Sequence, residues 1–189
     1  QSMEATNLDQ IRGIPYGMPS SIASSQAGSS SFFGAQIMTP AYTEVFMEYA
    51  EVEFLLAEAN GWSQDHYVKG VKASMERWGV SEASISEFVS ALPAASKENV
   101  LTQKYAALFM QPFEAWAEYR RTGYPNFLVK PGQTDLPLNV PTASGQTTYT
   151  FTSLIADLTD LPTRIYYPTN VQSLNTINYQ AAAQAIGGD

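Results

Sequence analysis

Two neighbouring stretches with helical periodicity, each followed by a glycine, constrain the fold of this chain more than any other feature of its sequence. Residues 42–60 carry apolar side chains in two adjacent rows at helical spacing, and residues 65–78 carry another such row. Gly61 and Gly79 follow them, and glycine readily adopts the left-handed conformation that ends helices. Because only a few residues join the two segments, we predict an antiparallel helical hairpin.

This hairpin has about the length of one tetratricopeptide unit, which is about 34 residues. The sequence contains one such unit, whereas a free-standing array needs about three stacked repeats. We therefore expect the hairpin to cap or continue a helical stack elsewhere. The apolar residues scattered through residues 1–40 have no predicted element of their own to pack on, so we also expect that the chain is not an autonomous domain.

The remaining segments complete an all-α prediction, a tetratricopeptide-like hairpin with long irregular loops. Residues 1–40 are rich in Ser, Gly and Pro and are predicted to be loop-rich, and residues 41–123 are predicted to be helical. Within the helical part we expect a short helix at 84–92, with Ser84 and Glu87 at capping-box spacing, and a longer one at 97–122 that kinks or restarts at Pro112. Residues 124–189 are predicted to form loops, an extended piece at 147–152 and a short C-terminal helix at 179–186.

Composition excludes several functional classes. The net charge is −8 with only ten Lys and Arg residues, so the chain lacks the basic face of a nucleic-acid binder. It contains no cysteine, which excludes disulfides, thiolate nucleophiles and zinc–thiolate sites. Its single histidine, His66, rules out a multi-histidine metal site, and we interpret it as a surface or capping residue. No cofactor and no metal are predicted.

Acidic residues recur at helical spacing in the first predicted helix, at Glu44, Glu48, Glu51 and Glu58. Such a row is compatible with a pair of catalytic carboxylates or with a solvated acidic face. A glycosidase needs two carboxyl groups about 5–9 Å apart in a cleft, and no acidic pair stands out here. We favour the solvated face and predict that the chain is not an enzyme.

Four sequence phrases, which occur in the expected order, resemble the SusD/RagB family, and specifically its SusD-like branch. They are 51–59 (EVEFLLAEA), 70–79 (GVKASMERWG), 102–105 with 114–125 (TQKY and EAWAEYRRTGYP), and 162–168 (PTRIYYP) followed by Asn175 and by 187–189 (GGD). Two positions depart from the family pattern. Val171 stands where the family often has Glu, and Pro112 stands where a Gly is frequent.

The resemblance implies a cell-surface, non-catalytic glycan-binding component of a nutrient uptake system. Its expected partners are a SusC-like TonB-dependent transporter and an oligo- or polysaccharide, and its expected place is the surface of the outer membrane. Family members are longer and carry an N-terminal lipid anchor, so residues 1–189 resemble the C-terminal part of a SusD-like domain, with the anchor outside this chain. An alternative is a helical-repeat module that docks the transporter without binding glycan.

Candidate ligand-binding residues are aromatic, because sugar capture uses flat aromatic faces flanked by polar groups. Tyr16, Phe32 and Phe33 lie in predicted loops, and Trp62 lies at a helix end where one ring face can stay in contact with water. Phe32 and Phe33 could equally fill a gap in the core of a larger parent protein.

The resemblance also highlights residues that we interpret as structural: Glu114, Trp116, Arg120, Arg121 and Arg164. The arginine pair at a helix C-terminus is compatible with binding an anionic sugar. We favour structural pairing instead, because cations there complement the helix dipole and carboxylates such as Glu114 are nearby. Trp116 lies on an apolar row and is predicted to be a core residue rather than a sugar platform.

Overall fold

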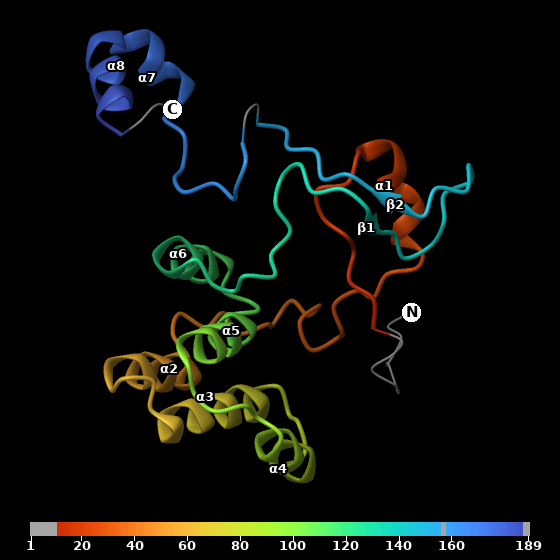
Figure 1. The fold of residues 1–189 in the computed structure, drawn as a ribbon, viewed down its shortest axis with the longest axis vertical. Helices are drawn as coiled ribbons and strands as arrows, with labels where there is room; N and C mark the ends of the chain where they lie inside the picture. The colour runs from red at the N-terminus through yellow and green to blue at the C-terminus, as the bar shows by residue number, and fades with distance from the viewer. Residues whose placement is uncertain (1–10, 156–157, 187–189) are drawn as a thin grey trace. The chain divides into compact units, whose positions relative to one another are not determined.

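The computed structural model describes residues 11–155 and 158–186, and it confirms a helical fold with long irregular connections (Figure 1). The chain forms two compact units. We call 1–14 with 26–129 the helical unit, and 15–25 with 130–189 the loop-rich unit. Residues 1–10, within the predicted N-terminal loop, and residues 187–189, which end the fourth phrase, lie outside the described residues.

The described part of the helical unit, residues 11–14 and 26–129, contains five complete helices, and its centre is the predicted hairpin. These are α2 (Tyr49–Ala59), α3 (Gln64–Arg77), α4 (Glu82–Ser90), α5 (Lys97–Ala107) and α6 (Pro112–Thr122). Helix α2 packs mainly on α3 and α5, and α4 packs on α3. Gly61 and Gly79 both adopt the left-handed conformation, with φ values of 68° and 73°. This conformation is the one expected of glycines that end helices, as the sequence predicted.

The core of the helical unit is formed by small and aromatic side chains from three helices. Helix α2 contributes Ala50, Phe54 and Ala57, α3 contributes Tyr67 and Val71, and α5 contributes Val100 and Ala107. A Cβ placed on Gly70 would lie 3.0 Å from the ring of Phe54, so the absence of a side chain at Gly70 lets the two hairpin helices approach closely.

The first predicted helix was too long at its N-terminal end, because α2 begins at Tyr49 rather than at residue 42. Its two apolar rows are not equally buried. The row that contains Ala50 and Phe54 faces the core, whereas Tyr49 and Leu56 of the other row remain 63% and 38% exposed. Phe46 is 91% exposed. Because most helix stability comes from packing of an apolar face, residues 42–48 lack the contacts that would hold them helical.

Proline and serine set the ends of the next helices. The predicted break at Pro112 is confirmed as a restart, because α5 ends at Ala107 and Pro112 occupies the first turn of α6. Helix α4 begins at Glu82, earlier than predicted, because the hydroxyl of Ser81 accepts a hydrogen bond from the Ser84 backbone N–H. The expected cap at Ser84 is therefore wrong.

A helix not predicted from the sequence, α1 (Ser20–Ala27), lies within the segment that was expected to be loop. Four of its eight residues are serines, which compete for backbone hydrogen bonds and so weaken the helical signal. The division between the two units falls inside this helix. Its last turn is nevertheless packed, since Gln26 is fully buried.

The loop-rich unit is built around a short antiparallel ladder of β1 (Leu136–Pro137) and β2 (Thr148–Tyr149). Of the two strands, β2 lies within the extended piece predicted at 147–152. The Tyr149 hydroxyl donates a hydrogen bond of 2.8 Å to the carbonyl oxygen of Tyr16, and the Thr152 N–H donates one to Gly17. Residues 15–25 are thereby joined to a segment more than a hundred positions away.

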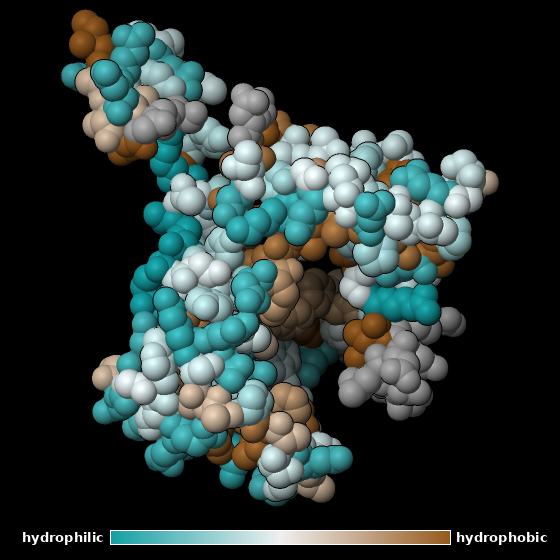
Figure 2. All heavy atoms as spheres, in the orientation of Figure 1, coloured by the Kyte–Doolittle hydropathy of each residue, from teal (hydrophilic) through white to brown (hydrophobic). Residues whose placement is uncertain are grey.

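The C-terminal end of the loop-rich unit is a pair of helices, α7 (Thr169–Leu174) and α8 (Thr176–Ala185), of which only α8 was predicted. They pack on each other, and Tyr179 meets Tyr167 edge to face at 5.7 Å. Leu174 and Ile177 are more than four-fifths exposed, and Figure 2 shows hydrophobic atoms at the surface of this pair, at the upper left. Among the described residues, none of the helices combines the length and apolar character that a membrane crossing requires.

Candidate ligand-binding surface

An apolar hollow of about 480 Å³ lies in the helical unit. Its wall is formed by residues 11–14 and 31–34 together with Ile37 and Phe109. This volume is within the range of about 300–1,000 Å³ that small-molecule sites occupy. Three phenylalanines line it, and all three are more than half exposed: Phe32 at 72%, Phe33 at 51% and Phe109 at 56%.

Backbone hydrogen bonds hold the two sides of this hollow together. The Ser31 N–H donates to the carbonyl oxygen of Arg12 at 2.7 Å, and the Arg12 N–H donates to Ser31 Oγ at 3.1 Å. Ile37 and Met38 both donate backbone hydrogen bonds to the carbonyl oxygen of Gly34, which closes the turn beside Phe33. Loop segments that have no regular secondary structure are thus fixed by their own backbone groups.

An aromatic cluster extends from the hollow across the helical unit. The ring centroids of Phe33 and Phe109 are 5.9 Å apart, and that of Phe109 is 5.8 Å from Trp78, which follows α3. The guanidinium of Arg77 lies 5.3 Å from the Trp78 ring centroid. These separations are those of favourable aromatic pairs and cation–π contacts.

Sequence reasoning missed Phe109 as a candidate, because this residue falls within the helix predicted at 97–122. Helix α5 ends at Ala107 and α6 begins at Pro112, so Phe109 lies in the connection and its side chain is not constrained to a helix face. The proline that predicted the restart was also the signal that could have placed Phe109 in a loop.

The four predicted ligand-binding residues have three different surroundings. Phe32 and Phe33 line the hollow together. Trp62 does not line it; this residue has a positive φ of 65° and packs, half-buried, on the hydrophobic core. Tyr16 belongs to the loop-rich unit, where its ring meets Phe151 edge to face at 5.5 Å and remains 45% exposed.

The loop-rich unit has an apolar hollow of its own, of about 640 Å³. Its lining includes Gly17, Phe151, Leu154 and Leu161. A Cβ on Gly17 would lie 2.0 Å from the Phe151 ring, so this glycine is required for the close approach of the two segments.

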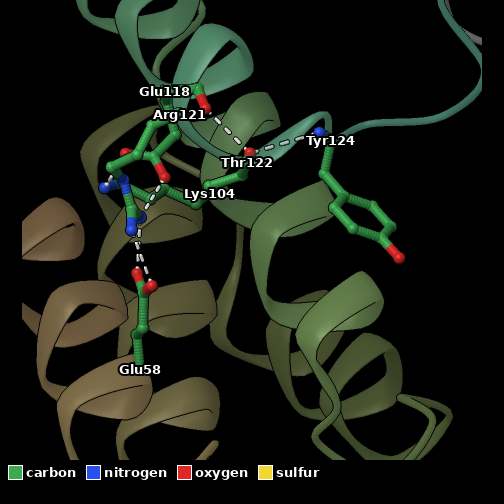
Figure 3. A network of polar contacts seen from close by, with 6 residues as sticks. All are labelled: Glu58, Lys104, Glu118, Arg121, Thr122 and Tyr124. Carbon is green, nitrogen blue, oxygen red and sulfur yellow. Dashed lines mark hydrogen bonds and ion pairs between the residues drawn. The ribbon is translucent and has the colours of Figure 1, made fainter.

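Ion pairs connect α2, α5 and α6, and Figure 3 shows them at close range. The buried Lys104 ammonium lies 2.7 Å from Glu118 Oε2. Arg121 donates to both carboxylate oxygens of Glu58, at 2.7 and 2.6 Å, and also contacts Glu118. These bonds lower the pKa of Glu58 and raise that of Arg121. Thr122 Oγ1 donates to the carbonyl oxygen of Glu118 and extends the network along α6.

The other residues that we interpret as structural have different surroundings. Glu114 is exposed at the start of α6. Trp116 is half-buried rather than part of the hydrophobic core cluster, and the Arg120 guanidinium lies 4.8 Å from its ring centroid. Arg164 lies 5.9 Å from the ring centroids of both Tyr166 and Tyr167 in the loop-rich unit.

The expectation of a solvated acidic face on the first helix is wrong at its centre. Glu51 is only 8% exposed, and burial raises the pKa of its carboxyl group. The neighbouring Glu53 is 4% exposed, accepts a hydrogen bond from the Tyr49 hydroxyl and lies 2.7 Å from His66 Nδ1. These two contacts lower the pKa of Glu53.

His66 therefore joins the two helices of the hairpin and is not the simple surface or capping residue that we predicted. Its side chain is 25% exposed, and Glu53 on α2 is its partner. Within residues 11–155 and 158–186, no group of three or more His, Cys, Asp or Glu side chains is arranged to hold a metal ion. The Glu53–His66 pair thus connects two helices inside the unit.

The arrangement described above is that of a helical scaffold with apolar, aromatic-lined surfaces, and comparison with known proteins defines its class. A Bacteroidetes protein of solved structure, described as "Bacteroidetes AC2a SusD-like", superposes with a TM-score of 0.55 at 28% sequence identity. The match covers 76% of this chain and 28% of the other, so the chain spans little more than a quarter of that relative. A search of curated proteins gives no match.

A family model matches residues 1–142, which is most of the chain. Its family is SusD-like, with the description "Starch-binding associating with outer membrane". The chain belongs to this SusD-like family. The family resemblance seen in the sequence is thereby confirmed.

Proposed function

We propose that this chain is a non-catalytic, glycan-binding component of a nutrient uptake system at the outer membrane, and that the hollow of the helical unit contacts the glycan. The family description supports glycan binding. The observation that carries the assignment to this hollow is the presence of three exposed phenylalanines around a volume of about 480 Å³. Exposed aromatic faces pack against the C–H faces of sugars, and large exposed apolar patches mark interaction sites.

The test compares residues inside and outside the hollow by affinity electrophoresis in gels that contain starch or another polysaccharide. We expect Phe33→Ala to weaken retention, with a dissociation constant roughly tenfold higher, which corresponds to about 1.4 kcal/mol. Phe113→Ala is the matched control, because Phe113 is 76% exposed on α6 and does not line the hollow. Equal retention of the Phe33→Ala variant and the wild type would contradict the proposed site.

A second candidate is docking to a SusC-like TonB-dependent transporter without direct glycan contact. Apolar surface on and just before α2 favours it, because Tyr49 and Leu56 on the outward row of the helix and Phe46, which precedes the helix, are exposed to solvent. Under both proposals the protein lies at the surface of the outer membrane, held by a lipid anchor. Residues 1–189 form the C-terminal part of a SusD-like domain under both. Co-purification of the transporter with the wild type but not with a Phe46→Glu, Leu56→Glu variant that still binds glycan would establish docking as a separate activity.

A further inference from the structure

The wall of the hollow in the helical unit is unusually poor in polar groups for a sugar site. Of its lining residues, only Arg12 and Ser31 have polar side chains. The Ser31 hydroxyl oxygen already accepts a hydrogen bond from the Arg12 N–H, and the Arg12 carbonyl oxygen already accepts one from the Ser31 N–H. The rest of the lining is isoleucine, phenylalanine and glycine.

A sugar ring can pack on the exposed faces of the phenylalanines, but this composition disfavours full burial of a bare sugar ring inside the hollow. Each ring hydroxyl that leaves water needs a new hydrogen-bond partner, and a hydroxyl buried against isoleucine or phenylalanine does not find one. An aromatic group has no such requirement. It buries apolar surface and can meet the phenylalanine rings edge to face or offset.

We propose that the hollow binds an aryl or aromatic acyl substituent carried by the glycan, while the sugar itself stays at the opening, where its hydroxyl groups remain in contact with water. The volume of about 480 Å³ accommodates a planar aromatic group. Phe32, Phe33 and Phe109 provide rings on which this group can pack. This inference rests on the proposed glycan-binding function and defines the ligand class for the same site.

Gly34 is a position at which a side chain can be added to the wall of the hollow. It lines the hollow, its φ lies outside the left-handed region, and a Cβ added to it would meet nothing within 4 Å. Gly28 is the matched control, because a Cβ added there also meets nothing within 4 Å and the residue lies outside the hollow. Both glycines belong to the helical unit.

The experiment measures binding of the full protein to matched ligands by isothermal titration calorimetry. One pair is 4-nitrophenyl glucoside and methyl glucoside, and the other is feruloylated arabinoxylan before and after alkaline removal of its ester groups. We expect the wild type and Gly28→Leu to bind the aryl-bearing member at least about tenfold more tightly. Gly34→Leu should lose this preference.

The outcomes separate this inference from the proposed function. Equal binding of both members of each pair by the wild type overturns the aryl preference and leaves glycan binding intact. If the Gly34→Leu variant keeps the preference, the hollow is not the aryl site. If no glycan of either pair or in the polysaccharide gels binds, the proposed function fails. Melting curves show whether Gly34→Leu folds, and if it does not, Phe32→Ala, at a residue 72% exposed, replaces it with the same expected loss.

Discussion

Replacement of Lys104 by methionine tests whether the ion pairs between α5 and α6 hold the helical unit together. Lys104 is 2% exposed, and its ammonium lies 2.7 Å from Glu118 Oε2. Methionine keeps much of the aliphatic stem but removes the charge. Glu118, whose side chain is 11% exposed, and Glu51, which is 8% exposed, then lose the buried cation between α2 and α6.

The cost follows from this burial. Removing one partner of a buried ion pair typically destabilises a protein by about 3–5 kcal/mol, because the remaining charge stays desolvated. Arg121 also contacts Glu118, and its side chain is 50% exposed, so part of the negative charge remains compensated. We therefore expect a loss of about 3 kcal/mol in the free energy of unfolding.

Lys69→Met is the matched control, because Lys69 pairs with Asp65 at the surface, where the two side chains are 48% and 68% exposed. Exposed pairs contribute about 0–1 kcal/mol, so this variant should lose less than about 1 kcal/mol. The two substitutions have the same chemistry and differ in burial. The comparison therefore isolates the effect of desolvation.

Urea unfolding followed by tryptophan fluorescence reports on the helical unit, because the three tryptophans, Trp62, Trp78 and Trp116, all belong to it. Adding Glu118→Gln to Lys104→Met should recover part of the loss, since the uncompensated carboxylate is removed as well. A Lys104→Met variant that loses no more stability than Lys69→Met would refute the argument.

Two further predictions concern other contacts. Glu53→Gln should lower the free energy of unfolding near neutral pH, because the contacts of Glu53 with Tyr49 and His66 lower the pKa of its carboxyl group. Urea unfolding at a series of pH values should show the full difference between variant and wild type above pH 4.5, the ordinary pKa of the group. The difference should disappear as the pH falls through the lowered pKa. Gly17→Ala should make the loop-rich unit more susceptible to limited proteolysis, because the added Cβ would lie 2.0 Å from the Phe151 ring. Gly145→Ala is the control, since Gly145 has a similar φ of 84° but open space around it. This variant should bear only about 1–2 kcal/mol of backbone strain and be cut more slowly.

Local sequence signals determined much of the helical framework. The hairpin of α2 and α3 follows from apolar spacing and from the glycines at 61 and 79, which need only neighbouring residues to act. The restart at Pro112 has the same local origin, since a proline removes one backbone donor wherever it stands. The family phrases are likewise local, and they were sufficient to indicate the SusD-like family.

Tertiary contacts decided which faces of these elements are buried. Apolar spacing cannot distinguish the row with Ala50 and Phe54, which is covered by α3 and α5, from the row with Tyr49 and Leu56, which is exposed. Burial of Glu51 and Lys104 among helices was equally hidden, because a charged side chain is stable there only once its partners have been brought together.

The candidate site shows the same division. The loop aromatics Phe32 and Phe33 were recognisable as candidates from residue type, but their meeting with Phe109 was not, because these residues are more than seventy positions apart in the sequence. A periodic pattern records the angle of a side chain around its own helix axis. Only the folded chain determines which distant segment that side chain meets, because loop conformation and packing depend on long-range contacts that a local pattern does not contain.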